Sequence, residues 1–248
     1  MFRDFFTGAS FVTRGLHAFF CDRKTWRYAL IPWALMSCIY AVAVFGIFWF
    51  AGKISVILSE SFANLPSWLS GILNFIITTT GVMIILLLLS AAVCFVYELL
   101  GGLFFDALTG YYEQKKYGTV PRKMSFSENL RYTLDSIGFG IRSAIVFIVF
   151  FICSLISSLI IPFAGQIILV LIMGYYIGIS YMISAAVNNH FSVKQLEKLC
   201  SEKKALVTGF GAAAYLLLSV PLGVLFFLPS LVLGATELFD EKIKKEPY

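Results

Sequence analysis

The chain has 248 residues, of which 59% are hydrophobic, 17% aromatic and only 13% charged. A soluble domain is about 25% charged, and one core of this size cannot hide so much apolar surface. The composition therefore excludes an ordinary soluble enzyme, a disordered tail, a disulfide mini-protein and a collagenous repeat. It predicts an all-α integral membrane protein with a single membrane domain, residues 1–248.

Residues 1–20 are predicted to form an amphipathic helix that lies in the membrane interface. Phenylalanine and aliphatic residues recur in this stretch at helical spacing, from Phe2 to Phe20. Charged residues are scattered among them, and no short apolar run precedes a small-residue cleavage site, so the pattern does not fit a secretory signal. A helix that faces a protein core is the alternative interpretation.

Four long stretches without any charged residue follow, at 28–52, 61–97, 143–193 and 205–236. About 20 apolar residues suffice to cross a hydrocarbon core about 30 Å thick. We interpret the first two stretches as transmembrane helices at 28–52 and 67–97. The second apolar run continues to Phe105, so we expect that helix to project beyond the membrane or to bend.

The last two stretches predict helical hairpins, at 143–187 and 205–239, that enter the membrane and return without crossing it. Each has an apolar turn at its middle, marked by Pro162, Gly165 and Gln166 and by Pro221 and Gly223. A loop that emerges into water is normally polar. The arms of the second hairpin, about 16 residues each, reach roughly 24 Å and fall short of the hydrocarbon thickness. Two ordinary pairs of spans are the alternative.

Two polar segments between these stretches predict short helices on the membrane surface, at 125–142 and 192–204. Each begins with a serine that Glu128 or Gln195 follows three residues later, which is the pattern of a capping box. Apolar residues then recur on one helical face.

Lysine and arginine concentrate in 1–27, 98–142 and 188–204 and near the C-terminus, whereas only Lys53 lies between the first two spans. The positive-inside rule then places both termini in the cytoplasm. The net charge of +5 reflects this bias. Because no basic stripe interleaves with exposed aromatic residues, we predict no nucleic-acid partner.

No catalytic, metal-binding or cofactor-binding constellation is visible in the sequence. The two histidines are far apart, the five cysteines form no CxxC pair, and there is no P-loop or GxSxG motif. We therefore predict no enzyme, no cofactor and no metal site. Two classes of function remain: transport of a solute and a scaffolding role in the membrane.

A cluster of cations, Arg23, Lys24 and Arg27, stands immediately before the first span. Fixed positive charge, free N–H groups and the positive end of a helix dipole together suit an oxyanion. Anchoring to anionic lipid head groups is the alternative interpretation. Glu98 and Asp106 follow the second apolar run, and an acid at membrane depth is a functional candidate unless it lies beyond the interface.

With these motifs the chain resembles the CysZ-type sulfate permeases of bacteria, which are grouped with the eukaryotic etoposide-induced membrane proteins. The most specific likeness lies in 221–229, with its two spaced prolines, and in the Gly-Ala-Thr at 234–236. The turn at 161–166 and the Asn-Asn-His at 188–190 resemble further family motifs, as does Trp26-Arg27 followed by Pro32.

The resemblance implies two full spans, two half-penetrating hairpins, two interfacial helices and homo-oligomers in a bacterial inner membrane. It also implies passage of sulfate into the cytoplasm for sulfur assimilation. The family's sulfate-binding arginine pair carries over onto Arg27 alone, because the first position is Trp26, and an asparagine of the last hairpin is Val224 here. We expect a permease or channel for sulfate or a similar oxyanion. A non-transporting membrane organiser of the same family is the alternative.

Overall fold

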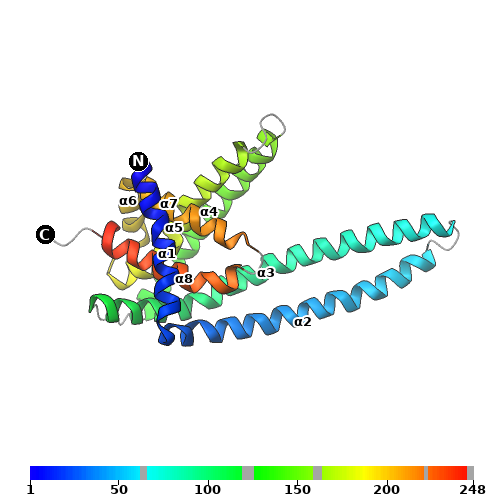
Figure 1. Cartoon of the computed structure of the whole chain (residues 1–248), viewed down its shortest axis with the longest axis horizontal. Helices are drawn as coiled ribbons and strands as arrows, with labels where there is room; N and C mark the ends of the chain where they lie inside the picture. Colours follow the sequence, from blue (N-terminus) through cyan, green and yellow to red (C-terminus); the bar gives the residue numbers. More distant parts are fainter. Residues whose placement is uncertain (62–65, 119–125, 159–163, 221–222, 245–248) are drawn as a thin grey trace. The chain divides into compact units, whose positions relative to one another are not determined.

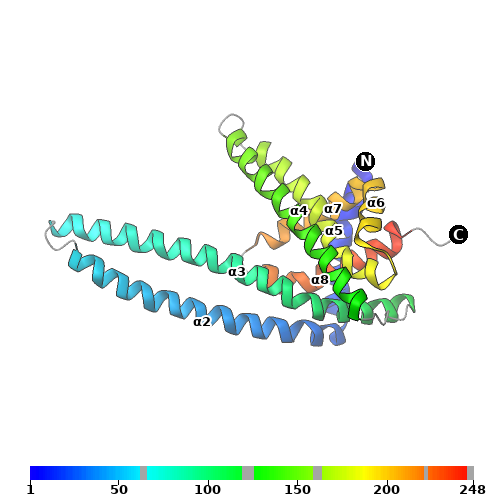
Figure 2. The same cartoon turned by 180° about the vertical axis from the view of Figure 1, so that it is seen from behind.

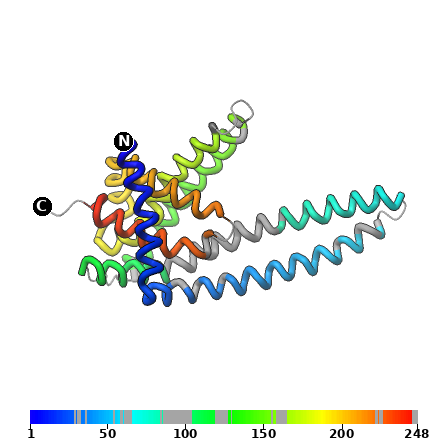
Figure 3. The backbone as a smooth tube through the Cα atoms, in the orientation of Figure 1, coloured from blue at the N-terminus to red at the C-terminus, as the bar shows by residue number. Residues whose placement is uncertain are grey.

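The computed structural model describes residues 1–61, 66–118, 126–158, 164–220 and 223–244 (Figure 1). Some helical side chains, including those of 86–103, also lie outside the description; the tube in Figure 3 shows these stretches in grey. Every regular element in the described part is a helix, which confirms the predicted all-α class. The helices are α1 (Phe2–Cys21), α2 (Arg23–Ser61), α3 (Ser67–Tyr117), α4 (Phe126–Ser158), α5 (Ala164–Asn188), α6 (Val193–Glu202), α7 (Lys204–Leu218), α8 (Gly223–Leu238) and the π-helix η1 (Phe239–Ile243).

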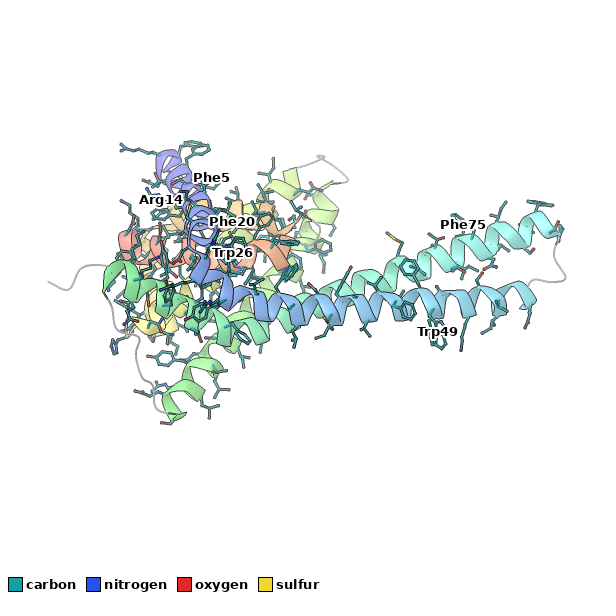
Figure 4. The ribbon with its side chains drawn as sticks, turned by 60° about the horizontal axis from the view of Figure 1, so that its bottom comes forward. Phe5, Arg14, Phe20, Trp26, Trp49 and Phe75 are labelled. Carbon is teal, nitrogen blue, oxygen red and sulfur yellow. The ribbon has the colours of Figure 1, made fainter. Side chains whose placement is uncertain are left out.

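The chain divides into two units: one combines Met1–Ala29 with Phe104–Tyr248, and the other is Leu30–Leu103. The second unit is a hairpin of α2 and α3. Its outer surface is apolar, and Trp49 and Phe75 point away from the hairpin, with 57% and 71% of their surface exposed (Figure 4). A side chain of this kind on the outside of a helix pair is typical of contact with lipid.

A small polar network joins the two helices of this hairpin. Asn74 Nδ2 donates to the carbonyl oxygen of Ser55 at 3.2 Å, and Ser55 Oγ donates to Asn74 Oδ1 at 3.2 Å. Thr78 Oγ1 donates to the same amide oxygen at 3.1 Å. Uncharged polar residues often link helices at membrane depth in this way, because an unsatisfied group in hydrocarbon is costly.

In the first unit, α5 and α7 approach each other closely through glycines. A Cβ atom at Gly174 would lie 2.6 Å from the backbone nitrogen of Ala212, and one at Gly178 would lie 2.7 Å from the carbonyl oxygen of Val207. Gly211 on α7 contacts the carbonyl of Gly174 in return. Gly174 and Gly178, which lie four residues apart in α5, therefore form a helix-packing face.

Helix α1 also packs on the protein, across α7 and α8 (Figure 1). Gly8 and Gly15 let its backbone approach the carbonyls of Leu206 and Ser230, and Phe11 between them is fully buried. Other aromatic residues of α1 remain exposed, namely Phe2, Phe6 and Phe20. One face of α1 thus faces a protein core, while a second, aromatic face is exposed, and its position in the membrane interface stays a prediction.

Helices α4 and α5 lie side by side (Figures 1 and 2). The predicted surface helix at 125–142 and the first hairpin arm belong to one continuous helix in the described residues, α4. Two segments here, Leu130–Ser154 and Gly165–Asn188, are each long and apolar enough to cross a membrane, as is Trp33–Ile57 in α2. Helices α4 and α5 are therefore long enough to cross a membrane completely. The arrangement of two full spans and two half-penetrating hairpins stays a prediction.

The last hairpin differs in length from the one before it. Helices α7 and α8 have 15 and 16 residues, which correspond to about 23 and 24 Å. Both are shorter than the hydrocarbon core of about 30 Å. Helix α6, which connects α5 to α7, has the predicted capping box of Ser192 and Gln195 and buries Val193, Leu196 and Cys200.

Candidate anion-binding site

The end of α1, Asp22 directly before α2, the end of α3 and the end of α8 line a cavity of about 690 Å³ that is open to the surface. Four basic side chains line it: Arg14, His17, Lys115 and Lys116. Asp22 and Glu237 are the acidic groups, and Thr13, Ala18, Cys21 and Tyr112 complete the wall. A cavity with several cationic donors is a plausible binding place for an oxyanion, because charge-assisted hydrogen bonds to oxyanions are strong.

The arginine and the two lysines of the cavity wall are each held by a carboxylate of the protein. Lys115 Nζ lies 2.6 Å from Asp22 Oδ2, and Lys116 Nζ lies 2.6 Å from Glu237 Oε1. Arg14 pairs with Glu241 at 3.0 Å. The hydroxyl of Tyr112 also donates to Glu237, whose side chain is only 6% exposed. An incoming oxyanion would compete with these carboxylates for the same donors.

Asp22 caps the N-terminus of α2. Its Oδ1 accepts from the backbone N–H of Lys24 at 3.0 Å, and its Oδ2 accepts from the hydroxyl of Tyr111 at 3.2 Å. The hydrogen bond from Lys115 lowers the pKa of Asp22 below its ordinary value. One of the free N–H groups expected at this helix start, that of Lys24, thus already contacts an internal anion.

The predicted cation cluster lies in the first turns of α2. Arg23, Lys24 and Arg27 are all exposed, and none of them belongs to the cavity wall. Within the described ranges, neither arginine pairs with an acidic side chain. The structure therefore places the predicted site at the surface, next in sequence to Asp22, and adds three cations that the sequence pattern did not single out.

Trp26, which stands where the family has an arginine, has a structural contact here. Its Nε1 donates to the carbonyl oxygen of Phe19 at 3.0 Å, and its ring stacks on that of Phe19 with centroids 6.3 Å apart. Thr25 Oγ1 donates to the same carbonyl at 3.0 Å. These contacts fix the corner between α1 and α2, with Arg14, Phe20 and Trp26 labelled in Figure 4.

The two predicted acids have different outcomes. The side chain of Glu98 lies outside the described residues. Asp106 lies in α3 and accepts a hydrogen bond from Ser184 Oγ of α5 at 2.5 Å. It does not line the cavity, so the structure does not bring it together with the cation cluster.

The predicted hairpin tips are described only in part, because Pro162 and Pro221 lie outside the described residues. Gly165 is buried, and a Cβ atom there would lie 2.7 Å from the carbonyl oxygen of Ser154. Gly223 is also buried, and a Cβ atom there would lie 2.5 Å from the carbonyl oxygen of Leu217. Gln166 lies at the exposed start of α5. Both glycines permit tight turns that a larger residue would obstruct.

A second polar cluster, which the sequence reasoning missed, joins the end of α3 to the end of α5. Glu113 of α3 accepts from Asn188 Nδ2 at 3.0 Å and from Asn189 Nδ2 at 2.9 Å. Lys244 Nζ donates to Asn189 Oδ1 at 2.6 Å. Only the Asn-Asn-His motif at 188–190 pointed to this region, and it gave no indication of an acid as its partner.

These features define an all-helical membrane protein with a charged cavity where its first membrane helix begins. The family model described as sulfate transporter CysZ/etoposide-induced protein 2.4 matches residues 11–229. The chain belongs to this family, which is a transporter family, and the predicted resemblance is confirmed. A comparison with curated proteins found no match.

Proposed function

We propose that the protein is a permease or channel for sulfate or a similar oxyanion and supports uptake for sulfur assimilation. The observation that carries this proposal is the cavity of about 690 Å³ with Arg14, Lys115 and Lys116 in its wall, immediately before the first membrane helix. Membership of a sulfate transporter family is consistent with it. The site takes no cofactor and no metal, and the protein is not an enzyme.

The ion pairs of the cavity allow an anion to bind without being trapped. An oxyanion that enters would take over donors from Asp22 and Glu237, and these carboxylates would recover them when it leaves. Conduction needs binding that is favourable enough for entry and weak enough for release. Competition by internal carboxylates provides that balance.

The exposed cations at 23, 24 and 27 would act from outside the cavity. Their charge raises the local concentration of anions and steers them to the start of α2. We assign Arg27 a contact with the oxyanion at the surface, before the oxyanion enters the cavity, and Arg23 and Lys24 a supporting role. Passage is passive or coupled to another ion, since the sequence has no P-loop for nucleotide.

Uptake of radiolabelled sulfate into proteoliposomes tests the proposal. We expect Lys115→Gln and Lys116→Gln to lower the initial rate by about tenfold, which is the effect of about 1.4 kcal/mol, and Arg27→Ala to lower it less. Lys194→Gln is the matched control, because Lys194 is exposed on α6 and lies outside the cavity wall. Uptake no faster than in empty liposomes would end the proposal, and an unchanged rate in the Arg27 variant would remove only that residue.

A non-transporting membrane organiser is the second candidate. The observation that favours it is that Arg14, Lys115 and Lys116 are all already paired with carboxylates. In that case the cavity is a structural charge network. Reproducible sulfate flux by the purified protein alone would exclude this candidate.

We further propose a location in the bacterial inner membrane, cytoplasmic termini and a homo-oligomer. The last hairpin, 205–239, would enter the bilayer and return, since α7 and α8 are too short to span it. A cysteine at position 222 would then stay inaccessible to an impermeant thiol reagent added from outside. Labelling at that position from outside, in the dispersed protomer, would show that the hairpin crosses.

A further inference from the structure

The two carboxylates of the cavity wall differ in how far the protein already occupies them. Both oxygens of Asp22 accept hydrogen bonds. Its Oδ1 accepts from the backbone N–H of Lys24 at 3.0 Å, and its Oδ2 accepts from Lys115 at 2.6 Å and from the Tyr111 hydroxyl at 3.2 Å. Asp22 is therefore satisfied by the protein itself and has no oxygen left over for a ligand.

Glu237 has an occupied oxygen and an unoccupied one in the described part of the chain. Lys116 Nζ and the hydroxyl of Tyr112 both contact Oε1, and no hydrogen bond from these residues reaches Oε2. Oε2 is not among the enclosed side-chain atoms without a partner, so it keeps some exposed surface. Because the side chain is only 6% exposed and belongs to the cavity wall, this oxygen is open toward the cavity.

The orientation of the Glu237 carboxylate is fixed from α3. Tyr112 and Lys116 lie four residues apart and so share one face of that helix. Burial raises the pKa of the Tyr112 hydroxyl above its ordinary value, so the hydroxyl remains a donor. Two donors on Oε1 keep Oε2 in a constant place, and a fixed position is what recognition of a single ligand atom requires.

Donors for the negative oxygens of a ligand lie in the same wall. Arg14 uses one N–H for Glu241, at 3.0 Å, whereas a guanidinium has five. Lys115 and Lys116 are the further cations of the wall. The cavity thus combines several N–H donors with one carboxylate oxygen that can only accept.

These two kinds of group respond differently to a hydrogen on the ligand. N–H donors bind any oxyanion, because they require only a negative oxygen. An ionised carboxylate oxygen cannot donate, so it repels a bare ligand oxygen but forms a strong hydrogen bond with a ligand hydroxyl. Sulfate carries no hydrogen at neutral pH, whereas hydrogenphosphate is a tetrahedral dianion of the same kind that carries one.

We propose that the cavity selects an oxyanion that carries a hydroxyl hydrogen, of the hydrogenphosphate class, and that this hydroxyl donates to Glu237 Oε2. The inference rests on the proposed function and narrows its solute, with sulfate as the weaker ligand of the same cavity. Arg14, Lys115 and Lys116 bind the bare oxygens of the ligand. Glu237 is then the residue that determines specificity.

The openness of the cavity to the surface limits the size of this preference. A closed site that hydrogen-bonds a substrate hydroxyl rejects an analogue without it by about 10⁴-fold to 10⁵-fold. Here water can enter between Glu237 and a bare ligand oxygen and relieve part of the repulsion. We therefore expect a preference of about tenfold, well below that of a closed site.

Titration calorimetry of the whole purified protein with hydrogenphosphate and monofluorophosphate tests the proposal. At mildly alkaline pH both are tetrahedral dianions of similar size, and they differ in that fluorine replaces the hydroxyl. We expect hydrogenphosphate to bind about tenfold more tightly, with sulfate close to monofluorophosphate. Glu237→Gln should remove the preference, because an amide can present an N–H to the cavity. Glu197→Gln, which alters an exposed pair with Arg142, is the matched control and should retain it.

Equal binding of the two dianions by the wild-type protein, or tighter binding of monofluorophosphate, would overturn the proposal, as would an unchanged preference in Glu237→Gln. If that variant does not fold, the wild-type comparison decides alone. Sulfate uptake into proteoliposomes is measured separately. Uptake without the preference would remove only this inference, and the preference without uptake would remove only the transport function. Binding of none of the three anions would end both.

Discussion

The glycines of the α5–α7 contact and those of the α2–α3 hairpin have opposite surroundings. In the first unit, Gly174 and Gly211 bring α5 and α7 into backbone contact, so that even a methyl group at either position would collide. In the α2–α3 hairpin, Gly71 and Gly81 have no neighbouring heavy atom within 4 Å of an added Cβ. The first unit is held together by close protein packing, whereas the hairpin presents its surface outward.

The polar networks differ in the same way. The hairpin has the uncharged contacts of Asn74 with Ser55 and Thr78. The first unit has charged groups, such as Glu237 with Lys116, inside packed protein. Charge is tolerated at low exposure only where partners and hydrogen bonds surround it, and lipid supplies neither. Among the described side chains, buried charge therefore belongs to the first unit, whereas the uncharged contacts of the hairpin suit a bilayer, as do the apolar segments of α4 and α5.

The largest effect is expected from a methyl group at the α5–α7 contact. Gly211→Ala places a Cβ against the carbonyl of Gly174 and 2.7 Å from the nitrogen of Gly178, which should cost about 3 kcal/mol of stability by overpacking. Gly71→Ala is the matched control and should be neutral or slightly stabilising, because alanine favours a helix. Thermal unfolding in detergent measures both, and equal midpoints would remove the distinction between the units.

Breaking the charged network should have the next largest effect. Lys116→Met keeps the length of the side chain but leaves the buried Glu237 without its cation. We expect a loss of about 2 kcal/mol, because removal of one partner leaves a desolvated group unpaired. Lys194→Met on the exposed face of α6 is the control. Unfolding by denaturant with both variants measures the difference, and identical midpoints would mean that Glu237 is satisfied by Tyr112 alone.

Much of this arrangement could be predicted from the sequence. The gaps between charges indicated the helices, the Ser192–Gln195 spacing indicated the cap of α6, and the motifs near 161–166 and 221–236 indicated the family. The cavity could not be predicted, because its partners are far apart in the chain: 227 positions separate Arg14 from Glu241, and 93 separate Lys115 from Asp22. A local pattern cannot encode pairs at such distances.

The protein-facing side of α1 was open to prediction but was obscured by its phenylalanines. Gly8 and Gly15 lie seven residues apart and so share one face of a helix, which is a signal for close packing. The aromatic residues of the same helix dominated the pattern and favoured the interface. In α1 the glycines mark the face that packs on other helices. The exposed phenylalanines mark the face that does not contact the rest of the chain.

The uncharged network of the hairpin should matter less than the charged one. Asn74→Leu removes three hydrogen bonds between and within α2 and α3. We expect a loss of about 1 kcal/mol, since hydrogen bonds between membrane helices average about 0.6 kcal/mol. Ser70→Ala, which affects only a bond to its own helix, is the control. A loss as large as that of Lys116→Met would contradict the proposed difference between the two networks.

The smallest effect is expected at the exposed ion pair of Arg142 and Glu197, which lie 3.2 Å apart with 59% and 28% of their side chains exposed. Water and salt screen such a pair, so Arg142→Gln should cost about 0.3 kcal/mol at low ionic strength and nothing measurable in high salt. Lys116→Met should keep most of its effect under the same salt, because Glu237 is buried. Unfolding midpoints of both variants at two salt concentrations distinguish the surface charges from the buried ones. An equal salt dependence would show that solvent reaches Glu237 as freely as it reaches the pair of Arg142 and Glu197.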